Sequence, residues 1–246
     1  MINARRSTDD ASSVVARLSC LAPLDTDALH LLDAAAGAAF ALRPRQEVLT
    51  EGRAIEAPLL LLDGWAARIR VLVDGRRQIV SLMLPGDVIG LSDLPEPVST
   101  STIIALTPVR VCPAPPRGAS PTLDLAYAVS RAHDEAYLLA QVTRLGRMNA
   151  QERIMDLLLE LYERLGFAGL VRSNGFDVPL TQETMSDALG LTPVHVNRML
   201  QAARKAEDLT WTGKRITLTD PARSARDLGR VPLRVQGDGA AKTTPA

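Results

Sequence analysis

Cysteine is nearly absent from this chain of 246 residues, which contains only Cys20 and Cys112. Two thiols cannot build a disulfide framework, and they cannot supply the four thiolates of a structural zinc or iron–sulfur site. We therefore expect no metal and no cofactor, and we predict that both cysteines act as small buried hydrophobic groups. A reducing compartment, the cytoplasm, fits this composition.

Aromatic residues, net charge and long apolar runs are also scarce. Aromatics make up 3% of the chain, so a core must come from aliphatic side chains. Lys and Arg number 28, as do Asp and Glu, which excludes a wholly basic nucleic-acid coat but not local basic patches. The longest apolar stretch, residues 29–42, contains His30 and Asp33 and is too short to span a bilayer. No membrane partner is expected.

Sequence motifs of common enzyme classes are missing as well. The chain has no Gly-x-Ser-x-Gly, no Gly-x-x-x-x-Gly-Lys-Ser/Thr and no His-Glu-x-x-His. We therefore expect a protein that is not an enzyme.

Apolar periodicity divides the first half of the chain into two parts. Residues 14–39 have helical spacing, with Asp25 or Thr26 as the N-cap of a second helix. From Phe40 to Cys112, short apolar runs alternate with turn residues at intervals of roughly ten residues. Asp74-Gly75 lies between two such runs and predicts a hairpin with a type I′ turn. Together the runs predict an antiparallel sandwich or roll.

Residues 121–148 contain no proline after Pro121 and predict one long helix. Its apolar stripe needs a partner, and a second copy of the chain is the simplest one. Packing on the sheet of the same chain is the alternative. The predicted homodimer seam consists of Ala132, Ala136, Leu139 and Thr143. Residues 150–165 predict another amphipathic helix that ends at Gly166, and residues 167–178 a connector.

The segment from Leu180 to Leu200 predicts a helix-turn-helix. A short helix starts at Thr181, and Gly190 permits a tight turn. Thr192 then caps a second helix, and Pro193 occupies its first position, where no backbone donor is missed.

One face of this second helix carries groups that can read base edges. At about 100° per residue, Val196, Met199, Leu200 and Ala203 share one side. The opposite side carries Val194, Asn197, Arg198, Gln201 and Lys205. An arginine can bind guanine with two hydrogen bonds, and Val194 can contact a thymine methyl group. A solvated helix face is the alternative interpretation, but the cap, the glycine turn and the phased amides favour DNA reading.

A short hairpin follows the predicted reading helix. Leu209-Thr210-Trp211 and Arg215-Ile216-Thr217-Leu218 flank Thr212-Gly213-Lys214, which is the arrangement of a wing. Lys214 and Arg215 at its tip suit phosphate contact, although plain surface residues would look the same.

These motifs resemble the Crp/Fnr superfamily of bacterial transcription regulators from about residue 17 to residue 229. Leu84-Pro85-Gly86-Asp87-Val88-Ile89-Gly90 is similar to the family's Pro-Gly-Asp-x-x-Gly turn, and Asp63-Gly64 resembles its glycine-marked hairpin. The resemblance implies an α+β protein with an N-terminal antiparallel β-roll (a cyclic-nucleotide-binding-like jelly roll), a long dimerisation helix and a C-terminal winged helix-turn-helix. The predicted divisions are a disordered tail (1–13), the roll (14–120), the dimerisation helix (121–148), the DNA-binding domain (149–230) and a second disordered tail (231–246).

The resemblance also implies DNA contacts, with Val194 and Arg198 at bases and Thr181, Gln182 and Thr192 near phosphates. The polar face of the second helix adds Asn197 as a predicted base-reading residue. The remaining predicted backbone contacts, from this helix and the wing, are His195, Gln201, Lys205, Lys214 and Arg215. Val194 stands where many family members have glutamate, so a different half-site is expected. The expected partners are double-stranded DNA, a second copy of the chain and RNA polymerase.

The effector pocket departs from the family pattern. Members that bind cyclic nucleotides carry Gly-Glu and then Arg-Ser/Thr-Ala, whereas this chain has Gly90-Leu91 and later Ser99-Thr100. Without the arginine, a buried phosphate has no counter-charge. We therefore expect DNA binding without a cyclic nucleotide, controlled by the amount of protein or by a different ligand, such as an apolar one. A ligand-binding roll whose helical end mediates protein contacts is the competing function.

Overall fold

The computed structural model describes residues 11–231 and 233–235. Two short helices come first, α2 (Ser12–Leu21) and α3 (Thr26–Ala36). Asp25 caps α3 by accepting a hydrogen bond from the Ala28 amide, as the sequence predicts. The predicted disordered segment 1–13 is too long at its C-terminal end, because α2 includes Ser12 and the buried Ser13. Residues 1–10 lie outside the described residues.

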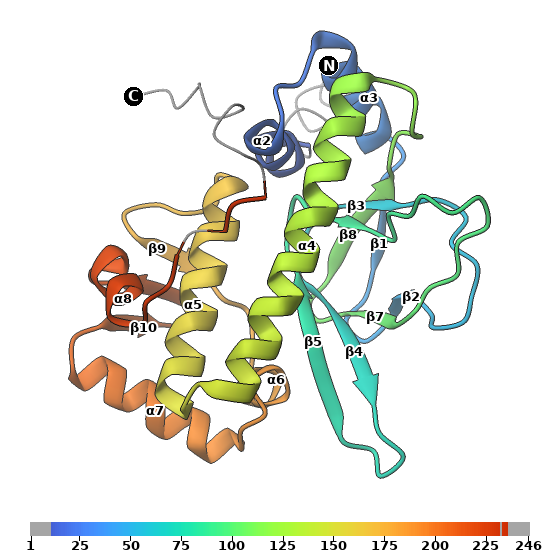
Figure 1. Ribbon diagram of the computed structural model, residues 1–246. Coiled ribbons are helices and arrows are strands. Elements are labelled where there is room, and N and C mark those ends of the chain that lie inside the picture. Colours follow the sequence, from blue (N-terminus) through green and yellow to red (C-terminus); the bar gives the residue numbers. More distant parts are fainter. Residues whose placement is uncertain (1–10, 232, 236–246) are drawn as a thin grey trace.

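Two four-stranded antiparallel sheets follow and form the predicted roll (Figure 1). Their strands are β1 (Phe40–Leu42), β2 (Glu47–Leu49), β3 (Leu59–Asp63), β4 (Ala66–Val71), β5 (Arg77–Met83), β6 (Val88–Ile89), β7 (Thr102–Ala105) and β8 (Val109–Pro113). The strand orders are β1-β8-β3-β6 and β2-β7-β4-β5. Aliphatic side chains such as Leu61, Ile103 and Val111 fill the space between the sheets.

The hairpin of β4 and β5 is confirmed, but its predicted turn type is wrong. Val71 pairs with Arg77, so residues 72–76 form the connection. Gly75 has a positive φ of 84°, whereas Asp74 is not among the residues with positive φ. A type I′ turn needs positive φ at both central positions. The longer loop instead closes through a hydrogen bond from the Leu72 amide to the Arg76 carbonyl.

The long helix α4 (Pro121–Arg147) stands between the roll and the C-terminal elements (Figure 1). Ser120 caps it by accepting from the Leu123 amide. Asn149 and Glu152 form a capping box that starts α5 (Ala150–Phe167) directly afterwards. This helix passes the predicted end at Gly166 by one residue.

The remaining chain forms the predicted winged helix-turn-helix. Its elements are β9 (Gly175–Asp177), α6 (Gln182–Leu189), α7 (Pro193–Lys205), β10 (Leu209–Thr212), β11 (Arg215–Leu218) and α8 (Pro221–Asp227). The sheet order is β10-β11-β9, so the predicted connector 167–178 contains a strand. The α+β architecture is therefore confirmed.

The predicted tail 231–246 begins too early. Val235 is partly buried against the apolar cluster around α2, and residues 232 and 236–246 lie outside the described residues. Within the described part of the chain, no helix combines the length and the hydropathy needed to cross a bilayer.

Candidate nucleic-acid interface

The turn between α6 and α7 is fixed by local hydrogen bonds. Thr181 caps α6 by accepting from the Thr184 amide at 3.1 Å, and Thr192 caps α7 by accepting from the His195 amide at 3.2 Å. Gly190 ends α6 with a φ of 62°, a conformation in which a side chain would be strained. The two helices therefore meet at a defined angle, as a helix-turn-helix requires.

The two sides of α7 differ as the helical spacing predicts. Val196, Leu200 and Ala203 are buried in the core of the C-terminal domain. Val194 is 80% exposed, and Asn197 and Arg198 are exposed beside it. The structure thus brings the three predicted base-reading residues together on an open surface. The Arg198 Nη2 atom lies 3.2 Å from His195 Nε2, which holds the guanidinium near the start of the helix.

The predicted backbone-contacting residues border this surface, with one exception. Six of these side chains are exposed, at the start of α6, along α7 and at the wing tip: Thr181, Gln182, Thr192, Gln201, Lys205 and Lys214. His195 is half-buried. Arg215 instead donates to the Arg172 carbonyl at 3.0 Å and the Gly175 carbonyl at 3.2 Å. It also pairs with Asp177 at 3.4 Å. These bonds hold β9 against β11, so we leave Arg215 out of the contacts proposed below.

Other parts of the chain hold the C-terminal end of α6. The last carbonyls of a helix have no partner within it. Gln78 of β5 donates to the Asp187 carbonyl at 2.7 Å, and Gln141 of α4 donates to the Ala188 carbonyl at 2.6 Å. Arg77 adds an ion pair with the Asp187 carboxylate. The roll and α4 therefore contact the helix-turn-helix directly, through residues that the sequence analysis did not identify.

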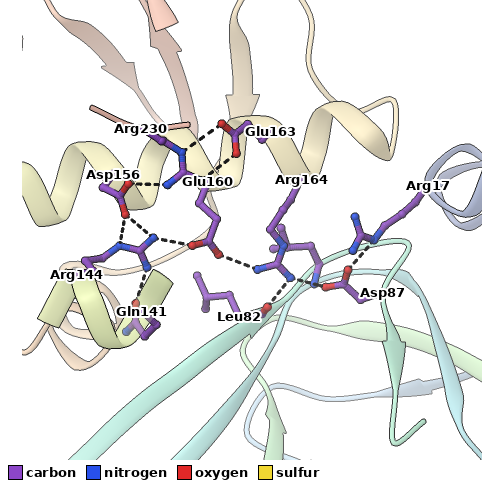
Figure 2. Close-up of polar contacts among 11 residues, drawn as sticks. Arg17, Leu82, Asp87, Gln141, Arg144, Asp156, Glu160, Glu163, Arg164 and Arg230 are labelled. Atoms are coloured by element: carbon purple, nitrogen blue, oxygen red, sulfur yellow. Dashed lines mark hydrogen bonds and ion pairs between the residues drawn. The ribbon is translucent and has the colours of Figure 1, made fainter. Parts of the chain in front are cut away.

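A buried chain of alternating charges joins the same parts of the molecule (Figure 2). Asp87 of the Pro-Gly-Asp turn pairs with Arg164 of α5 at 2.7 Å. In order along the chain of contacts, the members are Arg17, Asp87, Arg164, Glu160, Arg144, Asp156, Arg230 and Glu163. Positive and negative groups balance, so burial leaves no uncompensated charge. The network links α2, the roll, α4, α5 and the segment after α8.

Two ionisable side chains on the inner face of α4 lie close to this network. Burial is the main cause that lowers the pKa of His133 to about 4, and the nearby Arg17 and Arg164 add to it. Burial also raises the pKa of Asp134 to about 6, with the Asp87 carboxylate as the next cause. Both groups therefore favour their neutral forms more than in water.

The outer face of α4 is apolar and uncovered. Leu125, Leu139 and Val142 are 48%, 63% and 69% exposed. Of the predicted seam, Leu139 and Thr143 are exposed and Ala132 and Ala136 are half-buried. The three-and-four spacing of a coiled-coil seam joins Leu125, Ala128, Ala132, Glu135, Leu139 and Val142, all of them small or apolar except Glu135. This spacing would have identified Leu125 and Val142 from the sequence.

At the predicted effector pocket of the roll, Ser99 and the backbone of Thr100 are hydrogen-bonded within the chain. Ser99 is buried, and its hydroxyl donates to the Ser101 carbonyl at 2.7 Å. Its amide donates to the Arg53 carbonyl at 2.8 Å, and Arg70 donates to the Thr100 carbonyl at 2.8 Å. Residues 97–101 are thus bound to residues 52–55, where a nucleotide phosphate would need free donors.

The other two pocket positions are also engaged by apolar contacts. Leu91 is partly buried against the cluster around α2. A side chain at Gly90 would approach Leu49 Cδ1 to 3.0 Å and Ile55 Cγ2 to 3.2 Å. Cys112 is buried and Cys20 is exposed, so the predicted burial holds for Cys112 only. In the described ranges, no three His, Cys, Asp or Glu side chains gather as a metal site.

Comparison with known sequences finds one family profile in the N-terminal half of the chain and another in the C-terminal half. The profile of the cyclic nucleotide-binding domain matches residues 40–118, and that of the Crp-like helix-turn-helix domain matches residues 152–223. The chain is 32% identical over 197 residues to the transcriptional activator protein FnrL of Cereibacter sphaeroides, covering 75% of this chain and 77% of FnrL. It is 31% identical over 173 residues to the nitrogen fixation regulation protein FixK of Bradyrhizobium diazoefficiens, covering 66% and 70%.

Solved structures agree. FixK2 from Bradyrhizobium japonicum superposes with a TM-score of 0.67 and 26% identity, over 76% of this chain and 95% of that protein. TTHB099 of Thermus thermophilus, a transcriptional regulator of the CRP family, has a TM-score of 0.60 at 22% identity, over 77% and 96%. At this identity, the similarity to TTHB099 shows a shared fold.

Proposed function

The chain belongs to the Crp/Fnr family of bacterial transcription regulators, and we propose that it binds a two-fold symmetric operator in double-stranded DNA as a homodimer. The observation that carries this proposal is the exposed face of α7, where Val194, Asn197 and Arg198 stand free on a two-helix unit with a buried core. A helix of this kind fits the major groove, where such side chains distinguish base pairs.

The proposed contacts fall into two groups. Val194, Asn197 and Arg198 read bases. The backbone is contacted by Thr181, Gln182, Thr192, His195, Gln201, Lys205 and Lys214, which border the reading face. The first group determines the preferred sequence, and the second determines the register on the duplex.

Regulators of this family bind DNA and function as dimers. For this chain we place the dimer contact on α4. Its exposed seam, from Leu125 to Val142, is apolar apart from Glu135 and has the spacing by which two parallel helices interlock. A two-fold axis along α4 presents two copies of α7 to half-sites about 34 Å apart.

Cyclic AMP and cyclic GMP are not the effectors in this proposal. The backbone and side-chain donors of Ser99, as well as the Thr100 carbonyl, are bonded within the roll. A nucleotide phosphate would have to break these bonds and would find no guanidinium at position 99. Titration calorimetry with each nucleotide is expected to show no saturable binding at micromolar concentrations.

The remaining assignments follow from DNA reading. The family consists of regulators, which are not enzymes, and we assign no catalytic activity to this chain. A protein that reads the chromosome works in the cytoplasm of a bacterium, where RNA polymerase is a further partner. We retain a roll (14–120), a dimerisation helix (121–148) and a DNA-binding domain (149–230) as its functional divisions.

Selection of bound duplexes from a random pool tests the proposal. We expect an enriched palindrome, bound with an affinity that falls steeply with salt concentration. Enrichment of no sequence, together with binding that does not depend on salt, would refute DNA reading. That result would favour the competing function, a ligand-binding roll whose helical domain contacts proteins.

A further inference from the structure

A groove of about 320 Å³ opens between α6, α7 and the wing. Its walls carry Gln182, Asn197, Gln201, Arg204, Trp211 and Gly213, and two buried leucines form its floor. No carboxylate lines the groove. Three amides and one guanidinium therefore face the space, and this set of donors fits a negatively charged ligand.

Among the described residues that line the groove, Arg204 is the only charged one. Its side chain is exposed, and within residues 11–231 and 233–235 no hydrogen bond or ion pair engages its guanidinium. The nearby Arg215, by contrast, is bonded to its own chain. A free arginine beside amide donors can bind a phosphate oxygen with charge-assisted hydrogen bonds.

Trp211 closes the groove on the side of the wing. Its indole N–H donates to the Gly213 carbonyl at 3.0 Å, which fixes the ring across the hairpin tip. Gly213 has a φ of 62°, so this close turn favours glycine. The ring is only partly buried, and its free surface can pack against the carbon atoms of a sugar.

The groove continues the proposed reading face. Asn197, Gln201 and Arg204 are spaced by four and three residues, so they line one side of α7. Arg204 lies about 10 Å along the helix from Asn197. The major groove is about 12 Å wide, so a helix that places Asn197 at base edges brings Arg204 to the flanking backbone.

We propose that this groove binds the sugar–phosphate backbone of duplex DNA, with Arg204 on a phosphate and the Trp211 ring against the adjoining deoxyribose. The inference rests on the proposed function and adds two residues that the sequence analysis did not assign to DNA. Because the backbone is the same in every sequence, the contact contributes to affinity and not to sequence preference.

Salt dependence tests the role of Arg204. Arg204→Gln is compared with Arg223→Gln, a matched variant on α8 outside the groove. The ligands are a duplex of about 40 base pairs of mixed sequence, long enough for two half-sites one turn apart, and a selected duplex of the same length. We expect Arg204→Gln to weaken binding of both duplexes about equally, and to lower the slope of log affinity against log salt by about 0.9 per protomer. An unchanged slope, or a loss confined to the selected duplex, would overturn the assignment.

Fluorescence tests Trp211 separately. Trp65, the other tryptophan, is buried in the roll, and Trp211→Phe provides its spectrum alone. We expect saturating mixed-sequence duplex to shift the Trp211 emission and to protect it from acrylamide. Unchanged emission and quenching on a saturated duplex would overturn the inference while leaving the proposed function intact. Absence of binding to any duplex would overturn both.

Discussion

Polar residues are buried and hydrogen-bonded in the effector loop of the roll but exposed on the reading face of α7. Ser99 is buried, with its hydroxyl and its amide bonded to its own chain. Asn197 and Arg198 are exposed on a helix that satisfies its own backbone. An irregular segment needs partners for its main-chain groups, whereas a helix leaves its outward side chains available. Polar side chains are therefore engaged within the irregular segment of the roll and left available on the helix.

The roll has the fold of the family's nucleotide-binding domain, but the fold alone does not show that it binds a nucleotide. A fold can be retained after its ligand site is lost, because the fold depends on packing and the site on a few side chains. Here the apolar interior and the Pro-Gly-Asp turn of the roll are intact. Gly86 is required because a side chain there would lie 2.8 Å from Arg17 Cβ. The turn thus has a structural role that does not depend on nucleotide binding.

The largest expected effect is on stability, and it comes from removing the arginine that joins α5 to the roll. Arg164 is buried and pairs with Asp87 of the roll and Glu160 of α5. In Arg164→Met, Asp87 keeps its pair with Arg17 and Glu160 keeps its pair with Arg144. The network then holds one negative charge more than its positive charges balance, so the substitution should lower the free energy of unfolding by about 3–5 kcal/mol. Urea denaturation measures this. The control Arg223→Met, at an exposed pair on α8, should change stability by less than about 0.5 kcal/mol. Equal losses in the two variants would contradict the role of the network.

A second variant breaks the dimer while leaving each reading face intact. Leu139→Asp places charge on the exposed seam of α4, and we expect a monomer whose affinity for the selected duplex falls about a hundredfold. Light scattering and fluorescence anisotropy measure the two properties. Val73→Asp changes a fully exposed apolar residue in the β4–β5 connection and should change neither property. A monomeric variant with native affinity would show that one copy of α7 suffices.

A third variant tests base reading on the exposed face of α7. Arg198→Ala should cost about 1–3 kcal/mol on the selected duplex and relax the preference at one base pair in each half-site. Competition between selected and mixed-sequence duplexes separates reading from general affinity. Equal losses on both would assign Arg198 to the backbone instead.

The smallest expected effect concerns Asp134, beside the ionic network. Its folded-state pKa of about 6 lies above its ordinary value of 3.8, so the folded state binds this proton more tightly than the unfolded state. This group therefore adds stability as the pH falls from 7 through 6, and the ionised form is unfavourable at neutral pH. The groups that influence it most are Asp87, Arg17, Arg68 and Arg164.

Asp134→Asn mimics the protonated form. It should raise the free energy of unfolding at pH 7 by on the order of 1–2 kcal/mol, and the gain should disappear near pH 4. Urea denaturation of both proteins between pH 4 and 7 measures the difference. A gain that stays constant over this range would show that Asp134 does not titrate there.

The helix-turn-helix could be predicted because its signals are local. Thr192, Pro193 and Gly190 each determine a conformation within a few residues. β9 has three residues, too few to show a period, and its segment was therefore assigned to a connector. The hydrogen bond from Gln78 to α6 joins residues more than 100 positions apart in the sequence. A short sequence pattern cannot predict such a contact.

Side-chain roles were harder to predict than elements. Lys214 and Arg215 look alike in the sequence, but Lys214 is exposed at the wing tip and Arg215 bonds to β9 and the segment before it. The difference depends on where β9 pairs, which the connector sequence does not reveal. For the same reason Arg204 was overlooked, since the groove beside it forms only when the wing folds against α7.

The affinity for the selected duplex, measured by anisotropy with and without saturating cyclic AMP, tests the comparison most directly. We expect specific binding without the nucleotide and the same affinity in its presence, because the reading face is exposed and Ser99 is bonded within the roll. Specific binding that appears only when cyclic AMP is added would contradict this expectation.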